Sequence, residues 1–453
     1  DLGRLDDVRT AVAGVTDRSA NSKQQRIALT GYEYACDPSI EFDRDVTCDN
    51  VDTCDAANCG SCCQNGCLSC GRVCPAPCTS CPRINLANPY FNLNLSGAVI
   101  LDMLFNETRP VSPGTPFFLS PAAAAGLEEN TFDMHARQSQ IGAALVGPQF
   151  GGFQSGGFML AAFYNDAVIV DSYGFLPIQA YGELKSSEWR FAAGLQFDVF
   201  SPRAPTVLPF SILNASGNAG NAFRGQVRLE RYIQPSADRQ WTIQLALSEP
   251  VSTTISPELG VSEDNGWPNL EGRVALGCGC PVQGQRPYEL GLSGVVGQLR
   301  ETEFATSQST IDVWGASIDF YCSLSESCGI QAELFTGQGL GTYNAGILQG
   351  VNPVTSEAIE ASGGFVEFFA YLSECVHTHV GYGVDKPEDS YVGFLTGRLL
   401  NETYFANLIW DVNPTFRVAG ELAWRSTEWA ADPFIGNLNN DGIGFHTQFQ
   451  WRF

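Results

Sequence analysis

Cysteine is the most concentrated reactive residue in the chain, and most of it lies in one short segment. Of sixteen cysteines in 453 residues, eleven fall between residues 36 and 81. The pairs Cys59–Cys62, Cys67–Cys70 and Cys78–Cys81 have the spacing of zinc or iron–sulfur ligands, and no histidine follows them, which excludes c-type haem attachment. The segment has almost no large apolar residue, so it must be cross-linked or metal-bound to be ordered. We favour disulfides, with at least one thiol pairing elsewhere or staying free because eleven is odd.

Other reactive constellations are sparse. The chain has four histidines, and it contains no Gly-x-Ser-x-Gly, no Walker loop and no His-Glu-x-x-His. His377 and His379 share one face of a predicted strand and could bind a metal, but we favour two solvated polar side chains. We therefore expect no enzyme activity, no cofactor and no metal site.

Composition narrows the class of protein further. Apolar residues make up 44% of the chain, yet no run approaches the roughly 18 to 20 apolar residues of a spanning helix. The 47 glycines, 11% aromatics and 25 Lys and Arg suit an all-β chain. A net charge of -24 argues against nucleic-acid binding, because phosphate repels such a surface. Many cysteines indicate an oxidising compartment. Asp1 resembles the start of a processed mature protein, so we infer export.

From about residue 84 the pattern becomes uniform, with short alternating segments separated by polar, Gly-rich or Pro-rich breaks. Alternation over about ten residues predicts strands. The sixteen predicted strands are 90–106, 131–146, 157–166, 176–186, 188–200, 222–233, 239–248, 269–278, 288–300, 309–322, 328–338, 362–373, 375–385, 402–412, 414–426 and 441–453. In the last of them Phe445, Phe449 and Trp451 share one face, while His446 and Arg452 share the other.

The two faces of these strands differ in a way that predicts a membrane barrel. Trp189, Phe191 and Leu195 alternate with Arg190 and Asp198 in one strand. Charges in the middle of one face and aromatics at the ends of the other fit a lipid-facing band with aromatic girdles around a wet interior. The alternative for a single strand is a sandwich, with one face on a core and one in solvent.

The breaks alternate between short and long, as in an up-and-down outer-membrane barrel. An even strand count places both chain ends on the short-turn, periplasmic rim. The cysteines outside the Cys-rich segment all fall at short breaks, and they are Cys278, Cys280, Cys322, Cys328 and Cys375. A bridge between Cys322 and Cys328 across their hairpin is the simplest pairing, and one of the other three could take the odd N-terminal thiol.

The sequence divides into three parts on this reading. Residues 1–35 form a polar N-terminal segment whose Leu5, Val8, Val12 and Val15 have heptad spacing, either a surface helix or tail or the end of a short coiled coil. Residues 36–83 form a small Cys-rich, disulfide-stapled periplasmic segment. Residues 84–453 form an all-β, 16-stranded antiparallel transmembrane β-barrel.

The layout of residues 84–453 resembles bacterial outer-membrane porins of sixteen strands. The terminal Phe453 and the segments Arg137-Gln138-Ser139-Gln140, Gln179-Ala180-Tyr181-Gly182 and Ala193-Gly194-Leu195-Gln196-Phe197 look like a divergent trimeric porin of the DcaP-like kind. The resemblance implies a homotrimer in the outer membrane, in contact with its lipids. The Cys-rich insert at 36–81 departs from these porins.

The resemblance also implies that the third long loop folds into the lumen and narrows it. Here that loop is 201–221, which is unusually apolar and includes Phe210. The alternative is a loop that packs at the trimer interface. The predicted channel-lining charges opposite it are Arg190, Arg224, Arg228, Arg273, Glu183, Asp198, Glu230 and Glu271. Such charges either set a transverse field that selects solutes or pair off as structural ladders in the wall, and both can hold together.

Three functions remain open from the sequence. The first is a porin, a passive diffusion channel for ions and small hydrophilic solutes. The second is a structural outer-membrane barrel that anchors the envelope through residues 36–81, by binding cell wall or a periplasmic partner. The third is a secreted β-rich binding protein or glycosidase, which would be soluble without detergent.

Overall fold

One sheet forms almost the whole of the described chain. The computed structural model describes residues 84–87, 91–122, 129–165, 171–210, 217–250, 261–262, 266–281, 285–301, 310–352, 354–355, 357–392, 397–431 and 436–453. The predicted N-terminal parts, residues 1–35 and 36–83, lie outside these residues. No helix in the described ranges is long and apolar enough to cross a bilayer.

The wall of the structure is made of antiparallel strands that follow one another in chain order. These strands are β2 (Asn92–Asn106), β3 (Thr131–His135), β4 (Gln140–Phe150), β5 (Phe153–Tyr164), β6 (Tyr173–Lys185), β7 (Trp189–Phe197), β8 (Phe223–Ser236), β9 (Arg239–Ser248), β11 (Asn269–Cys278), β12 (Tyr288–Glu301), β13 (Thr310–Ser323), β14 (Cys328–Gln338), β15 (Glu360–Tyr371), β16 (Val376–Pro387), β17 (Arg398–Asn413), β18 (Phe416–Trp429) and β19 (Asn440–Arg452). Two short strands, β1 (Ile84–Ala87) and β10 (Val261–Ser262), add to β2 and β12.

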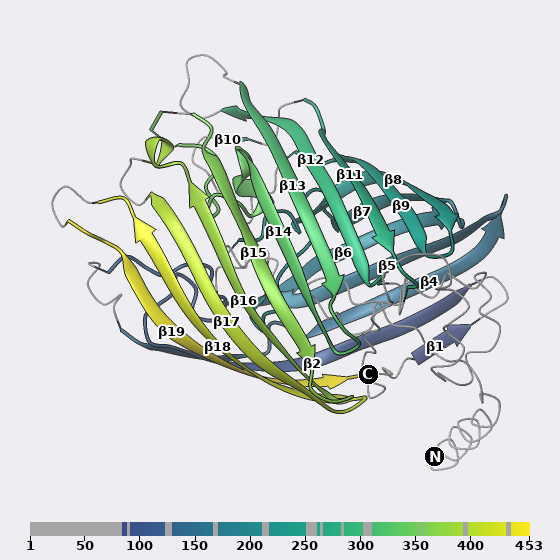
Figure 1. The fold of residues 1–453 in the computed structure, drawn as a ribbon, viewed down its shortest axis with the longest axis horizontal. Coiled ribbons are helices and arrows are strands. Elements are labelled where there is room, and N and C mark those ends of the chain that lie inside the picture. The colour runs from purple at the N-terminus through teal and green to yellow at the C-terminus, as the bar shows by residue number, and fades with distance from the viewer. Residues whose placement is uncertain are drawn as a thin grey trace, which may run out of the picture.

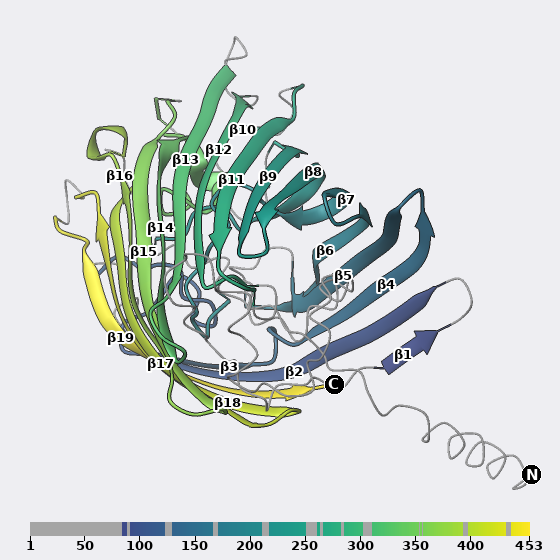
Figure 2. The ribbon, with the colours of Figure 1, turned by 45° about the vertical axis from the view of Figure 1, so that its right-hand side comes forward.

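The sheet closes on itself into a barrel. The last strand, β19, pairs with β2, for example Phe449 with Leu101, and β2 pairs in turn with β3 and β4. Because β3 and β4 are two halves of one interrupted strand, the wall has sixteen strands, as predicted. Figures 1 and 2 show these strands running obliquely around the wall of the barrel. Closure removes every sheet edge and satisfies the backbone hydrogen bonds, as a barrel in lipid requires.

The outer face of the ring is apolar, as the alternation predicted. In β19 Phe445 is 51% exposed and Trp451 47%, whereas His446 on the other face is 4% exposed. Aromatic side chains gather near strand ends, with Trp189 and Trp410 beside the short turns. An apolar band bounded by aromatic residues is the surface that a lipid bilayer solvates. A sandwich core for these residues is therefore excluded.

The two rims differ as expected. Turns such as 151–152 and 414–415 are short, while connections such as 198–222 and 339–359 on the opposite rim are long. The last residue, Phe453, bonds to the backbone of Gly97 near the start of β2, so the chain ends at the short-turn rim.

Most predicted strand bounds differ from the structure by one to four residues, as at 157–166, which is Phe153–Tyr164, and two of the differences concern the lumen. The predicted strand 131–146 is interrupted, because residues 136–139 leave the ladder between β3 and β4. The predicted strand 188–200 ends at Phe197, so the following loop starts three residues earlier than expected. Both departures occur where the backbone turns toward the interior of the barrel.

Candidate functional site: the lumen and its inward loops

The described part of the loop between β7 and β8 lies inside the barrel. We call residues 198–222 the inner loop; 198–210 and 217–222 are described. Its hydrogen-bond partners are inward-facing residues on β11, β12, β13, β14, β15, β17, β18 and β19. The loop therefore follows the inner wall across much of the ring. Its prolines lack an N–H group, which suits an irregular chain that must satisfy few donors of its own.

Carboxylates from the wall hold the first part of this loop. Glu271 on β11 accepts the N–H groups of Val199 at 2.6 Å and Phe200 at 3.1 Å. Glu333 on β14 accepts the N–H of Arg203 at 2.9 Å. Both glutamates are at most 1% exposed. A buried carboxylate needs such donors, and a hydrogen bond to a charged group contributes about 1.5–3 kcal/mol.

The loop tip, residues 206–208, is held in the same way. Glu367 on β15 accepts the N–H of Thr206 at 2.5 Å, and Glu421 on β18 accepts that of Leu208 at 2.8 Å. Gln138, from the interruption between β3 and β4, donates to the Leu208 carbonyl at 2.9 Å. The broken strand thus supplies one of the contacts that fix the tip.

A second loop, residues 339–359, also folds inward, and the sequence reasoning missed it. We call it the upper loop; residues 339–352 are buried without interruption. The Asp385 carboxylate on β16 accepts the N–H groups of Gly346 at 3.1 Å and Ile347 at 2.7 Å. Ile347 has φ 54°, a strained backbone for a β-branched residue, so the surrounding bonds must hold it there.

The two loops meet at Arg224 on β8. Its guanidinium donates to Asp198 at 2.6 Å and to the carbonyl of Thr342 at 2.8 Å, and it lies 4.0 Å from the ring centre of Tyr343. Burial raises the pKa of the Tyr343 phenol well above its ordinary value. The hydroxyl therefore stays protonated, and it accepts a bond from Asn269 at 2.8 Å.

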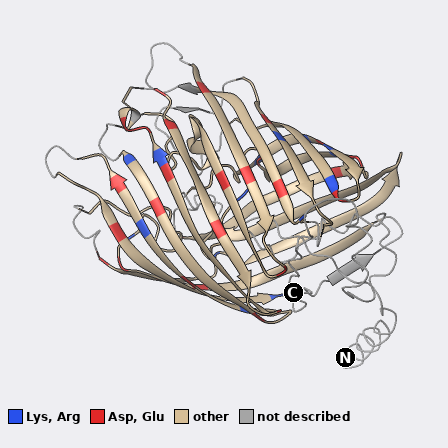
Figure 3. Cartoon of the chain, viewed as in Figure 1, with Lys and Arg blue, Asp and Glu red and all other residues tan. Residues whose placement is uncertain are grey.

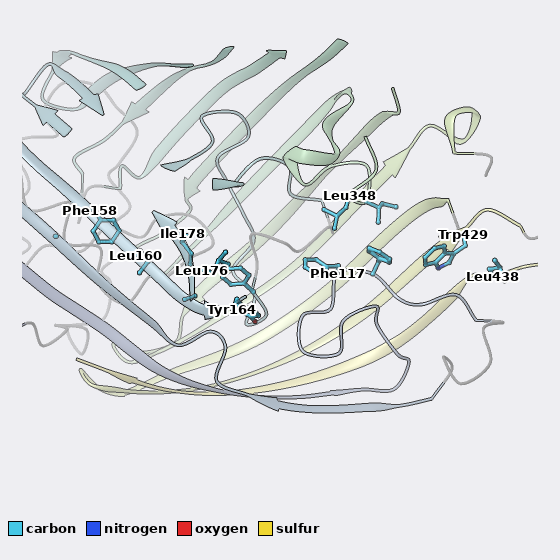
Figure 4. Packing of buried hydrophobic residues seen from close by; sticks show 14 residues of the cluster. Phe117, Phe158, Leu160, Tyr164, Leu176, Ile178, Leu348, Trp429 and Leu438 are labelled. Carbon is cyan, nitrogen blue, oxygen red and sulfur yellow. The ribbon is translucent and has the colours of Figure 1, made fainter. Parts of the chain in front are cut away.

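Apolar side chains fill the space between the loops and the wall. Phe117 and Phe118, from the loop after β2, join Phe210 of the inner loop and Ile347 of the upper loop in one cluster. The Phe210 ring stacks on Tyr164 of β5 with centroids 4.6 Å apart. Figure 4 shows this cluster strung along the interior. The burial of these rings explains why such apolar loops fold inward instead of into water.

The charges predicted to line the channel face the interior, and several pair off. Arg190 on β7 donates to Glu183 on β6 and, at 2.9 Å, to Glu230 on β8. Arg228 lies 3.6 Å from Glu230. Figure 3 shows acidic residues recurring along the middle of neighbouring strands. The charges around Arg190 therefore fit the alternative that these residues pair off as structural ladders in the wall.

The remaining predicted charges hold loops. Asp198 and Arg224 join the two inward loops, and Glu271 is the first anchor of the inner loop. Arg273 on β11 is bound by Asp319 at 2.7 and 2.9 Å. Asp319 also accepts from Arg203 of the inner loop at 2.8 Å, so this pair reaches the loop too.

The two histidines of β16 are buried and bonded, so the expectation that they are solvated is wrong. His377 Nδ1 lies 2.8 Å from His379 Nε2, and His379 Nδ1 lies 2.6 Å from Glu367. The described residues contain no group of three or more His, Cys, Asp or Glu side chains placed to hold a metal ion.

The cysteines outside the Cys-rich segment lie at the short-turn rim, as expected. Cys375 is disulfide-bonded. The predicted bridge between Cys322 and Cys328 is wrong, because both are thiols in the structure. The hairpin register opposes Cys322 to Ile330, which leaves the two cysteines two positions apart. The pairing of Cys278 and Cys280 stays a prediction.

Several residues that shape the lumen have no distinguishing signal in the sequence. The anchors Glu333, Glu367, Glu421 and Asp385 look like any other inward acid in an alternating strand. The upper loop did carry a signal, because residues 339–356 contain no charged residue, which is unusual for a long loop in water.

Sequence comparison identifies no relative. No family model matches the chain, and no curated protein matches it.

Structure comparison finds barrels of one kind. The outer-membrane channel DcaP of Acinetobacter baumannii superposes with a TM-score of 0.63 at 14% identity, covering 81% of this chain and 99% of that one. An anion-selective porin from Comamonas acidovorans gives 0.52 at 9% identity, covering 80% and 100%. OmpT of Vibrio cholerae, described as a trimer form, gives 0.50 at 11% identity, covering 80% and 100%. The chain therefore has the fold of outer-membrane porins.

Proposed function

We propose that this protein is a porin, a passive diffusion channel for ions and small hydrophilic solutes in a bacterial outer membrane. The inner loop carries the proposal. Glu367 and Glu421 bind the tip of this loop to the lumen wall. In this proposal the tip narrows the lumen and does not block it by itself. The apolar outer band contacts the membrane lipid. Solutes cross the lumen by diffusion and are not chemically changed.

We propose further that three copies assemble, with the short-turn rim in the periplasm. Support for the trimer comes from the OmpT structure described as a trimer form. Support for the orientation comes from the contrast between short turns and long loops, which in outer-membrane barrels face the periplasm and the exterior.

Conductance in planar bilayers tests the channel. The purified protein should insert with discrete steps in potassium chloride, and the steps should come in groups of three. Removing residues 204–208 should raise the step size, whereas removing five residues from the connection 302–309 between β12 and β13 should leave it unchanged. A folded barrel that inserts and conducts nothing would refute the proposal.

A second function is favoured by the uninterrupted burial of 339–352 and by the disulfide at Cys375. In it the barrel is a structural element, its lumen closed by inward loops, that anchors the envelope through residues 36–81. This function predicts no conductance, together with retention of the full chain, and not of a chain lacking residues 1–83, by cell-wall sacculi.

A further inference from the structure

A cavity lies against the tip of the inner loop, in the lumen. Its volume is about 80 Å³, and it is bounded by 206–210 and by the walls of β2, β4, β5, β6, β17, β18 and β19. At about 30 Å³ of liquid volume per water molecule, this space holds about three waters, which is the room of one part of a small organic solute. A solute that crosses the constriction would pass beside or through it.

One part of the cavity lining is aliphatic and aromatic. Ile100, Ile178 and Ile409 project from the wall, and Leu208 and Phe210 project from the loop. Each of the five is at most 6% exposed. Inward-facing isoleucines are unusual in a water-filled barrel, whose interior is ordinarily polar. Contact between this surface and an apolar face of a solute lowers the free energy, because both leave water.

The other part is made of amide side chains. Gln138, Gln140, Gln448 and Gln450 approach from the interruption before β4, from β4 itself and from β19. Gln138 and Gln448 use their amide nitrogens to hold the carbonyl of Leu208, at 2.9 and 3.4 Å. Both amide nitrogens also donate to Asp102, at 3.0 and 2.8 Å, and the Gln450 oxygen accepts from Arg452. The row therefore offers a neutral polar group the oxygens of Gln138 and Gln448 as acceptors and the nitrogen of Gln450 as a donor.

Charge in the lining is neutralised. Among the described lining residues Arg417 is the charged one, and it donates to both oxygens of Asp411, at 2.8 and 2.9 Å. Asp411 also lies 3.1 Å from Arg452, and Asp102, which accepts from the lining glutamines, supplies a second carboxylate, so two arginines are balanced by two aspartates. An ion entering the cavity would lose water without gaining an opposite charge of its own, which costs free energy.

We propose that this cavity is a selectivity site for uncharged solutes that combine an apolar face with an amide or hydroxyl group. The proposal rests on the channel function above and adds the class of solute. Ions pass the constriction without binding, whereas a neutral amphiphilic solute pauses with its apolar face on the isoleucines and its polar group on the glutamines.

Block of the potassium chloride current by matched solutes tests the site. Benzamide, benzoate and benzamidinium have nearly the same shape and differ in charge, and acetamide has the amide without the ring. Benzamide should reach half-block at a concentration at least about tenfold below the other three. Acetamide lacks the ring, whose burial adds well over one factor of ten, and benzoate and benzamidinium carry a charge that must be desolvated without a partner. Equal block by benzoate, benzamidinium or acetamide would overturn the proposal.

Variants locate the site within the lumen. Gln140→Glu is isosteric and places a charge in the lining; at roughly 5 Å in a water-like medium it should strengthen block by benzamidinium and weaken block by benzoate about fourfold each. Gln149→Glu, on the same strand beside the short turn, is the control and should change neither. Ile409→Thr should weaken block by benzamide and leave acetamide unaffected.

The outcomes separate this inference from the channel itself. A protein without conductance refutes the channel, and the selectivity site with it. A conducting protein in which Gln140→Glu and Gln149→Glu behave alike keeps the channel and refutes the site.

Discussion

Replacing the two carboxylates that hold the tip of the inner loop should loosen that tip without unfolding the barrel. The change is Glu367→Gln together with Glu421→Gln. Each glutamine keeps the shape of the side chain and an oxygen acceptor, so the N–H groups of Thr206 and Leu208 keep a partner. What disappears is the negative charge on the acceptor.

The expected size follows from the hydrogen bonds. A bond to a charged acceptor contributes about 1.5–3 kcal/mol and a neutral one about 0.5–1.5 kcal/mol, so each replacement costs about 1 kcal/mol. Local opening should become about fivefold more frequent in each single variant. The sites are on β15 and β18, and additive effects give roughly thirtyfold in the double variant.

Amide hydrogen exchange of the peptide covering 204–210 measures this opening directly, because the exchanging amides include the anchored ones. Open-channel current noise should rise in the same order. Glu402→Gln is the matched control, since Glu402 accepts a bond from Tyr382 on the outer face and touches no inward loop.

Exchange rates within a factor of two of the parent in the double variant would refute the reasoning. That result would mean that the apolar contacts of Phe210, and not the carboxylates, fix the loop. Faster exchange in the control as well would instead show a general loosening of the barrel.

Three further outcomes are expected. Peptide mapping without reduction should link Cys375 to one of the eleven cysteines at 36–81. Leu334→Lys, on the outer face of β14, should lower the unfolding free energy in lipid vesicles by about 2–4 kcal/mol, and Thr336→Lys nearer the rim by at most about 1 kcal/mol. Arg224→Lys keeps the charge but loses the planar contact with its tyrosine, so exchange in the upper loop should quicken about tenfold.

The wall of the barrel could be predicted because each strand meets lipid on one side. Lipid contact forces a period of two on every strand, so the pattern is local and can be read residue by residue. Phe445 and Trp451 are outward and His446 inward for this reason. The interruption of the strand at 136–139 could not be predicted, because it depends on contacts across the lumen. Gln138, for example, bonds to Leu208, which is seventy positions away in the sequence.

The lumen could be predicted in part. Apolar residues such as Phe210 indicated an inward loop, because loops exposed to water are mostly polar. The anchors could not be found, since Glu421 and Leu208 are 213 positions apart and nothing local distinguishes an anchoring acid from a solvated one. The predicted bridge from Cys322 to Cys328 was wrong because the strand register places Cys322 opposite Ile330, two residues from Cys328. The spacing of the cysteines in the sequence does not reveal this register.

Anchoring and electrostatics cannot be varied independently in this lumen. Glu271, Glu333, Glu367 and Glu421 accept bonds from N–H groups of the inner loop. If the protein is the proposed channel, removing their charge to alter its ion preference would also move that loop. The ladder around Arg190 differs, because Arg190 donates to Glu183, Gln196 and Glu230, which lie on β6, β7 and β8 and not on an inward loop. A change of ion preference that leaves the loop in place should therefore come from this ladder. A change at the anchors should appear in conductance and in noise together.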